Sequence, residues 1–176
     1  MIRTARLILR PWREADRAPC AAMTTDPEVM RYFGMLRERP ASDAWIDRTR
    51  AHFDREGFGI WAVEAPVVAP FIGFVGLSRV PDFLPDAGGI EAVWTLDRAF
   101  WRRGYAREAA AAAMEDGFGR LGIGEIVAFT AAINAPSRGV MLALGMRYEA
   151  AFEHPKLPEG SPLRAHVVYR KQALLF

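Results

Sequence analysis

Cysteine and lysine are both scarce in this sequence of 176 residues. The single cysteine, Cys20, leaves no intramolecular disulfide possible, which fits a reducing compartment. Cys20 lies in an apolar stretch of helical character, so we expect a buried thiol rather than a nucleophile. Only Lys156 and Lys171 are lysines among the 23 basic residues, so arginine carries nearly all of the positive charge.

Long hydrophobic runs are absent too. No segment approaches the roughly 20 apolar residues that a membrane-spanning helix needs, and no apolar stretch follows the charged start of the chain as it would in a secretory signal. We therefore expect a cytoplasmic protein. The net charge is only +2. The arginines are interleaved with acidic residues and do not form the basic stripe that predicts nucleic-acid binding.

Several nucleotide-binding and hydrolytic motifs are missing. No Walker A sequence occurs, which argues against a P-loop NTPase. The Gly-x-Gly-x-x-Gly at 117–122 lies at the end of a predicted helix and not between a strand and the start of a helix, so a dinucleotide-binding Rossmann domain is not expected. No Gly-x-Ser-x-Gly elbow is present, so a serine hydrolase is not expected. His52, His154 and His166 are far apart in the sequence and no cysteine cluster exists, so we expect no metal site.

The sequence has the composition of an ordinary globular domain. Hydrophobic residues make up 51% and charged residues 25%, and the length fits one domain over residues 1–176 with a sizeable core. The hydrophobic periodicity predicts strands and helices in the order β-α-α-β-β-β-α-β-α-β-β. This order is typical of an α/β or α+β sheet protein with a central βαβ unit. Strands are expected at 4–10, 58–64, 71–80, 88–96, 125–131, 146–152 and 165–170, and helices at 13–23, 42–56, 106–121 and 136–144.

The most informative segment is 101–106, which joins a predicted strand to the clearest predicted helix. The first turn of a helix leaves about four backbone N–H groups unpaired, and with the helix dipole these form an anion site. Gly104 lets the backbone approach a phosphate closely, and Arg102 and Arg103 add positive charge. We interpret the segment as a pyrophosphate-binding turn. An ordinary strand-to-helix connection with a glycine is the alternative.

Six segments together carry a family resemblance through their order and spacing. They are 4–12 (TARLILRPW), 90–96 (IEAVWTL), 100–109 (FWRRGYAREA), 134–137 (NAPS), 142–146 (LALGM) and 166–169 (HVVY). Across nearly its whole length the chain resembles the GNAT acyl-CoA N-acyltransferases, specifically the branch of the RimJ and RimL ribosomal-protein acetyltransferases. The resemblance implies a single-domain GNAT fold with a mixed central sheet of six to seven strands, a splay between the central strands and about four helices. It also implies acetyl-CoA as co-substrate.

By this resemblance, the loop before the central helix binds the pyrophosphate of coenzyme A through backbone amides. The family pattern there is [Gln/Arg]-x-x-Gly-x-[Gly/Ala]. Trp101 stands at its first place, as is common in this branch, and Arg102 stands where the branch often has glycine. The residues implied in cofactor binding are Arg102, Arg103, Gly104, Tyr105, Ala106 and Arg107 in the loop, Trp94, Thr95 and Leu96 along the pantetheine arm, and Asn134 and Ser137 further on.

Glu91 is the candidate general base. It lies just before the cofactor segment between apolar neighbours, where desolvation raises a carboxyl pKa toward useful values. It also matches a glutamate often found at this point in relatives, which mostly let the amine attack the thioester directly in a ternary complex. The base acts directly or through a water, and a plain sheet-edge position is the alternative. A backbone N–H near Trp94 or Thr95 is the expected oxyanion donor.

Asn134 and Ser137 precede the short helix expected at 136–144. As plain structure, Asn134 is a helix N-cap with Pro136 in the first turn. By the resemblance, Asn134 bonds the cofactor arm and Ser137 donates a proton toward the leaving thiolate, and both interpretations can hold together. Tyr148 is the reserve proton donor.

The acceptor cleft is expected where the first helices meet the late hairpin. Tyr32 and Phe33 look like a loop over this cleft and His154 could line it, whereas Trp45 and Phe58 are expected in the core. An apolar, aromatic cleft suits a peptide or protein N-terminus or a small hydrophobic amine. We therefore predict an acetyl-CoA-dependent N-acetyltransferase, and the alternative is a catalytically silent acyl-CoA-binding sensor of the same fold. No nucleic-acid or membrane partner is expected, and dimers are common in the family.

Overall fold

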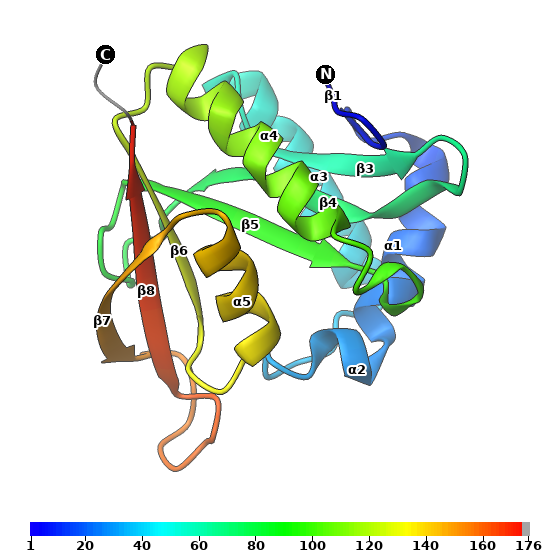
Figure 1. Ribbon diagram of the computed structural model, residues 1–176. Helices are drawn as coiled ribbons and strands as arrows, with labels where there is room; N and C mark the ends of the chain where they lie inside the picture. Colours follow the sequence, from blue (N-terminus) through cyan, green and yellow to red (C-terminus); the bar gives the residue numbers. More distant parts are fainter. Residues whose placement is uncertain (174–176) are drawn as a thin grey trace.

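The chain folds around one mixed sheet with helices on both faces (Figure 1). The computed structural model describes residues 1–173. The eight strands lie in the order β1-β2-β3-β4-β5-β6-β8-β7, and within the described residues β5 and β6 form the one parallel pair. The strands are β1 (Ile2–Arg3), β2 (Ile8–Arg10), β3 (Ile60–Ala65), β4 (Ala69–Arg79), β5 (Ile90–Leu96), β6 (Glu125–Ala131), β7 (Arg147–Glu153) and β8 (Ala165–Gln172).

The helices divide between the two faces of the sheet. Helix α4 lies over β4 and β5 and contacts α5, whereas α1 and α3 pack against each other on the opposite face (Figure 1). In the part of the chain that the structure describes, no helix has both the length and the apolarity to cross a membrane. The helices are α1 (Arg17–Thr25), α2 (Pro27–Met30), α3 (Arg39–Glu56), α4 (Tyr105–Gly119) and α5 (Ala135–Ala143), with short 3-10 turns η1 (Glu14–Asp16) and η2 (Arg98–Phe100).

The predicted mixed α/β fold is confirmed, but the predicted number of strands was too low by one. Of the single strand expected at 4–10, residues 8–10 form β2, whereas residues 4–7 form a turn in which the Thr4 N–H donates to the Leu7 carbonyl. The extra strand, β1, precedes this turn and pairs with β2. A fifth helix, α2, was also missed. Pro27 stands in its first turn, and the carboxylate of Asp26 caps it by accepting from the Glu28 N–H.

Alternation along β5 separates the two halves of the core. Ala92 and Leu96 face α4, whereas Val93 packs into the cluster under α1 and α3. On the α4 side the contact is close, because a Cβ on Gly117 would lie 2.6 Å from the Leu77 side chain. The small residues of the predicted apolar face therefore let α4 approach the sheet, and they bury Ala109 completely.

The centre of the sheet opens between β5 and β6. The parallel pairing of these strands is limited to Glu91 opposite Val127, and from there the two strands diverge (Figure 1). β6 instead pairs along its whole length with β8, from Glu125 to Ala131. The opening leaves the second half of β5 without a partner strand on one side, and α5 begins close to this gap.

Candidate functional site

The loop before α4 has the backbone of an anion cradle. Arg102 and Gly104 adopt left-handed conformations, with φ of 60° and 78°, and the first hydrogen bond of the helix runs from the Glu108 N–H to the Gly104 carbonyl. Within residues 1–173 the N–H groups from Arg102 to Arg107 have no hydrogen-bond acceptor. Six unpaired amides at the positive end of a helix dipole fit a phosphate or pyrophosphate group.

The N-terminal hairpin holds this loop in place. The Glu108 carboxylate accepts from the Thr4 hydroxyl at 2.6 Å and from the backbone N–H and Nε of Arg6 at 2.9 and 2.7 Å. Arg6 also donates through Nη1 to the Arg103 carbonyl at 2.9 Å. Sequence reasoning missed this anchor, because more than 100 residues separate the partners and no local pattern joins them.

A second tie links the loop to the end of β5. The indole Nε1 of Trp101 donates to the Leu96 carbonyl at 2.8 Å, and the carboxylate of Asp97 caps the intervening turn by accepting from the Ala99 N–H. The cradle is thus fixed relative to the strand that borders the gap in the sheet. Arg102, Arg103 and Arg107 all have exposed side chains beside it.

Backbone geometry in β5 directs one N–H group into the gap. The Asp97 N–H bonds the Ile72 carbonyl, and the Val80 N–H bonds the Gly89 carbonyl, so odd-numbered residues of β5 exchange hydrogen bonds with β4. The N–H and carbonyl groups of Trp94 therefore face away from β4, toward the side where β6 has diverged. This N–H is available to a ligand carbonyl oxygen placed in the gap.

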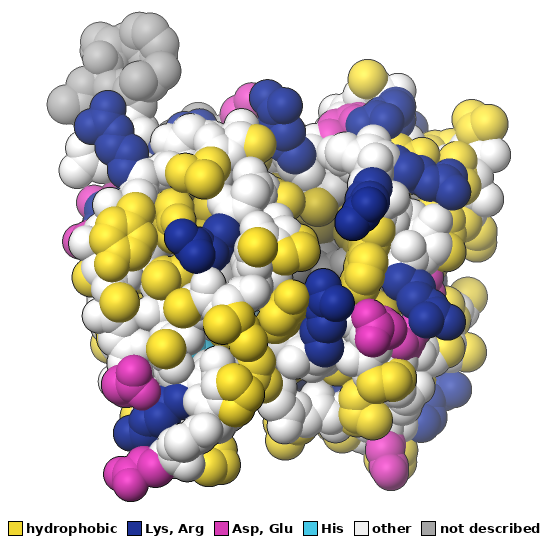
Figure 2. Space-filling model, turned by 60° about the horizontal axis from the view of Figure 1, so that its bottom comes forward, with side chains coloured by type: hydrophobic (Ala, Val, Ile, Leu, Met, Phe, Trp, Pro, Cys, Tyr) yellow, Lys and Arg dark blue, Asp and Glu magenta, His cyan; other side chains and the backbone are white. Residues whose placement is uncertain are grey.

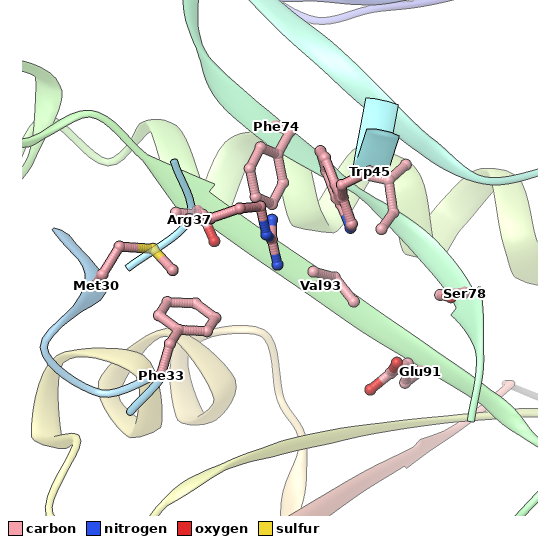
Figure 3. Close-up of a pocket in the computed structure, with 10 residues that line it drawn as sticks. Met30, Phe33, Arg37, Trp45, Phe74, Ser78, Glu91 and Val93 are labelled. Atoms are coloured by element: carbon pink, nitrogen blue, oxygen red, sulfur yellow. The ribbon is translucent and has the colours of Figure 1, made fainter. Parts of the chain in front are cut away.

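A cavity of about 190 Å³ lies on the face of β5 that is opposite to α4 (Figure 3). Its lining includes Glu91, Val93 and Thr95 of β5, with Met30 and Phe33 from the α2 region. Seen from the end at which β5 and β6 diverge, the surface is hollowed between the two halves of the molecule, with hydrophobic and basic side chains around the hollow (Figure 2). The cavity and the cradle thus border β5 from different sides.

Glu91 is a partly buried carboxyl group without a charge partner. Burial raises the pKa of Glu91 to about 7, and within the described residues it forms no ion pair. A carboxyl group with this pKa exchanges protons readily near neutral pH, which is the property a general base requires. The predicted desolvation of Glu91 is therefore present in the structure.

Asn134 and Ser137 lie together at the start of α5. The Asn134 side chain caps the helix by accepting from the Ser137 N–H at 3.3 Å, and it donates through Nδ2 to Thr130 at 2.8 Å. Within residues 1–173 no protein group bonds the Ser137 hydroxyl. Tyr148 lies on the edge strand β7, where its side chain is 55% exposed and packs edge-on against Tyr169.

The residues expected around the acceptor are only partly brought together. Phe33 lines the cavity, whereas Tyr32 does not and instead stacks with the Arg31 guanidinium. His154 lies on the β7–β8 hairpin beside Phe83 and His166, outside the lining.

The two aromatic residues assigned to the core differ in position. Trp45 lines the cavity as well as packing against Phe74, and Phe58 is buried. Sequence reasoning missed Arg37, which also lines the cavity. In the described part of the chain, no group of three or more His, Cys, Asp or Glu residues could hold a metal ion.

Relatives of the chain include proteins with acetyltransferase names. An uncharacterized N-acetyltransferase of Bacillus subtilis, YoaA, is 27% identical over 169 residues, which cover 95% of this chain and 94% of the relative. The FsC-acetyl coenzyme A-N(2)-transacetylase of Aspergillus fumigatus is 30% identical over 162 residues, which cover 86% of this chain and 66% of the relative.

Solved structures share the fold along nearly the whole chain. A GNAT-family acetyltransferase of Bacillus anthracis superimposes with a TM-score of 0.82 at 22% identity, covering 98% of both chains. RimL, a ribosomal L7/L12 alpha-N-protein acetyltransferase solved in complex with coenzyme A, gives a TM-score of 0.76 at 14% identity, covering 96% of this chain and 95% of RimL. Because the sequence identities to these two structures are 22% and 14%, the comparison with them shows a shared fold alone.

The family model of the acetyltransferase (GNAT) domain matches residues 6–147, which contain Arg6 and Glu108 of the N-terminal anchor, β5, the loop before α4 and the start of α5. The site geometry, the fold and this match agree, and the chain belongs to the GNAT acetyltransferase family and is an acyltransferase.

Proposed function

We propose that the protein transfers an acetyl group from acetyl-CoA to a primary amine, either of a peptide or protein N-terminus or of a small molecule. The observation that carries the proposal is the divergence of β5 from β6, with the amide cradle at one side of β5 and the Glu91 cavity at the other. A cofactor whose pyrophosphate is held by the cradle can place its thioester in the gap beside β5. An amine in the Glu91 cavity then meets the thioester there. Holding two reactants together supplies much of the rate in such a reaction.

The residues around the gap fit coenzyme A. The six unpaired amides from Arg102 to Arg107 suit its pyrophosphate, and the unpaired edge of β5 from Trp94 to Leu96 suits its amide-rich arm. When bound there, acetyl-CoA supplies the activated acetyl group. RimL, which shares the fold, was solved with coenzyme A.

In this proposal, protein groups handle the protons and the developing charge. Glu91 takes the proton from the acceptor amine, directly or through a water, and its pKa of about 7 suits that task. The Trp94 N–H, which faces the gap, donates to the carbonyl oxygen as negative charge develops there. The amine attacks the thioester directly, and no covalent enzyme intermediate is involved.

Ser137 is proposed to donate a proton to the departing thiolate. Its hydroxyl lies at the start of α5, near the gap, and is not used by a protein acceptor in residues 1–173. We expect Ser137→Ala to lower kcat about tenfold while the KM for acetyl-CoA changes little, because positioned proton transfer is lost and binding is kept. Steady-state kinetics measure the effect, and Tyr148→Phe serves as the matched hydroxyl deletion. A larger loss in Tyr148→Phe than in Ser137→Ala would reverse the assignment.

Two measurements test the proposed function. Acetyl-CoA should raise the melting temperature, since a ligand present at about 100 times its Kd adds about 2.7 kcal/mol to the stability of the folded state. Free thiol should then appear when amines and N-terminal peptides are added as acceptors. Absence of a thermal shift at millimolar acetyl-CoA would contradict the proposal. A shift without turnover on any acceptor would favour the alternative, a catalytically silent acyl-CoA sensor.

A further inference from the structure

Arg37 places an unpartnered positive charge in the acceptor cavity. Its side chain is partly buried, and in the described part of the chain no acidic group lies within ion-pair distance of it. Most arginines of this protein are exposed and many pair with carboxylates, for example Arg39 with Asp43 at 2.7 Å. Burial without a counterion lowers the pKa of Arg37. Such an arrangement costs free energy unless a ligand supplies the missing anion.

The backbone of Arg37 is anchored so that its side chain is held over the cavity. The Arg37 N–H donates to the Thr24 carbonyl at 2.9 Å, and the Thr24 hydroxyl donates back to the Arg37 carbonyl at 2.9 Å. The guanidinium lies over the Trp45 ring, 5.0 Å from its centroid. Figure 3 shows it pointing into the space between Phe33 and Phe74. A planar guanidinium fixed on an aromatic face is preorganised for bidentate recognition.

A second polar group in the same cavity also has no partner. Thr95 is only 7% exposed, and its hydroxyl oxygen has no hydrogen-bond partner in residues 1–173. Thr95 lies opposite Phe74 in the sheet, and Phe74 packs on Trp45 with ring centroids 4.5 Å apart. Thr95 and Arg37 therefore lie at the same end of the cavity. Buried hydroxyl groups are normally satisfied, so this one indicates a ligand acceptor atom.

The opposite end of the cavity holds Glu91. Glu91 and Thr95 share one face of β5 four residues apart, which separates their Cα atoms by roughly 13 Å. Glu91 and Arg37 do not form an ion pair with each other, so neither charge neutralises the other. An apolar cavity with a carboxyl group at one end and a guanidinium at the other is complementary to a molecule that carries both an amine and an anion.

We propose that the acceptor is a small amine that also carries a carboxylate, such as an amino acid, with Arg37 and Thr95 binding the carboxylate while Glu91 receives the amine proton. This inference rests on the proposed acetyl transfer and specifies its substrate class. The cavity volume of about 190 Å³ suits a small acceptor, because pockets that bind drug-sized ligands have volumes of roughly 300–1,000 Å³. A single guanidinium and one hydroxyl group match a carboxylate, which has two oxygens to satisfy.

The experiment compares amino acids that have apolar side chains with their carboxamides as acetyl acceptors. Each pair keeps the α-amine and side chain and differs in the carboxylate, and kcat/KM is corrected for the fraction of free amine. For the preferred side chain we expect the wild-type protein to favour the carboxylate by about 10- to 100-fold. Arg37→Met should abolish this preference, and Arg37→Lys should retain part of it. Arg31→Met, which changes an exposed arginine paired with Glu28, should keep it.

The outcomes separate the inference from the proposed function. Equal use of amino acids and carboxamides by the wild-type protein, or a preference that survives in Arg37→Met, would overturn the inference and leave acetyl transfer intact. Turnover confined to amines without a carboxylate would also overturn the inference and leave acetyl transfer intact. No turnover with any acceptor would contradict both. A readout independent of turnover is the melting temperature, which an N-acetyl amino acid should raise more than its carboxamide in the wild-type protein and equally in Arg37→Met.

Discussion

Replacing Glu91 by glutamine is expected to lower kcat by about 10²- to 10⁴-fold, the usual contribution of a general base. Glutamine keeps the size and polarity of the side chain but cannot accept the amine proton. The affinity for acetyl-CoA should be unchanged, since the amide cradle lies in the loop before α4 and does not involve Glu91. Steady-state kinetics measure the loss of kcat, and calorimetric titration with acetyl-CoA measures the affinity.

The pH dependence of the same reaction reports the titration of Glu91. Because burial raises its pKa to about 7, ionisation of Glu91 should contribute about a tenfold rise in the wild-type kcat/KM per pH unit below pH 7 and no further rise above pH 7. Deprotonation of the acceptor amine contributes equally to the wild-type and glutamine profiles. The inflection near pH 7 should therefore disappear in Glu91→Gln, and its persistence would assign the titration to another group.

Stability provides the control that Glu91→Gln remains folded. A carboxyl group whose pKa is raised by folding stabilises the folded state below its unfolded-state pKa, and this contribution is lost as the pH rises through about 7. At pH 8 the desolvated carboxylate of Glu91 therefore lowers the stability of the folded state, and glutamine removes this cost. The free energy of unfolding at pH 8 should rise by roughly 1–3 kcal/mol, measured by urea denaturation. A kcat within threefold of wild type in this stable variant would remove Glu91 as the base.

Replacing Gly104 by valine is expected to weaken acetyl-CoA binding by roughly 100-fold. Gly104 has φ of 78°, a conformation that is a genuine outlier for a β-branched side chain and costs of order 1–3 kcal/mol. The loop can relieve this strain only by moving, and its unpaired amides then no longer converge on the pyrophosphate. The added Cβ would also lie 3.4 Å from the Arg6 guanidinium, which is part of the anchor to Glu108.

Gly122→Val is the matched control for that variant. Gly122 follows the other end of α4 and has a similar φ of 65°, with no atom within 4 Å of an added Cβ. It should suffer a comparable loss of stability from backbone strain while its affinity for acetyl-CoA stays at the wild-type value. Isothermal titration at a temperature where both variants are folded measures the difference. Equal affinities in the two variants would show that the Gly104 loop does not hold the cofactor.

Local patterns determined much of the architecture. The apolar run at 125–131 was predicted as a strand with the observed bounds of β6, and the small-residue face of the central helix packs on the sheet as expected. The left-handed Gly104 before a helix start is likewise a local feature that a sequence can reveal. The strand expected at 4–10 is present at residues 8–10 but was wrong for residues 4–7, where Thr4 begins a turn and its side chain is bound by the distant Glu108.

The sequence by itself determined the family, through the order and spacing of six short segments. It also determined the loop before the central helix and the position of Glu91 in an apolar strand, since each of these is a pattern of neighbouring residues. Only the tertiary structure decided what faces Glu91. Arg37 belongs to the loop between α2 and α3, in which no local pattern marks it as different from the other arginines. Thr95 lies in β5, whose successive side chains point to opposite faces of the sheet. They share a cavity because Thr24 holds the Arg37 backbone and Phe74 sits opposite Thr95 in the sheet. Contacts between distant segments produce no periodic pattern in a sequence, so the charge of Arg37 in this cavity could be found only in the folded molecule.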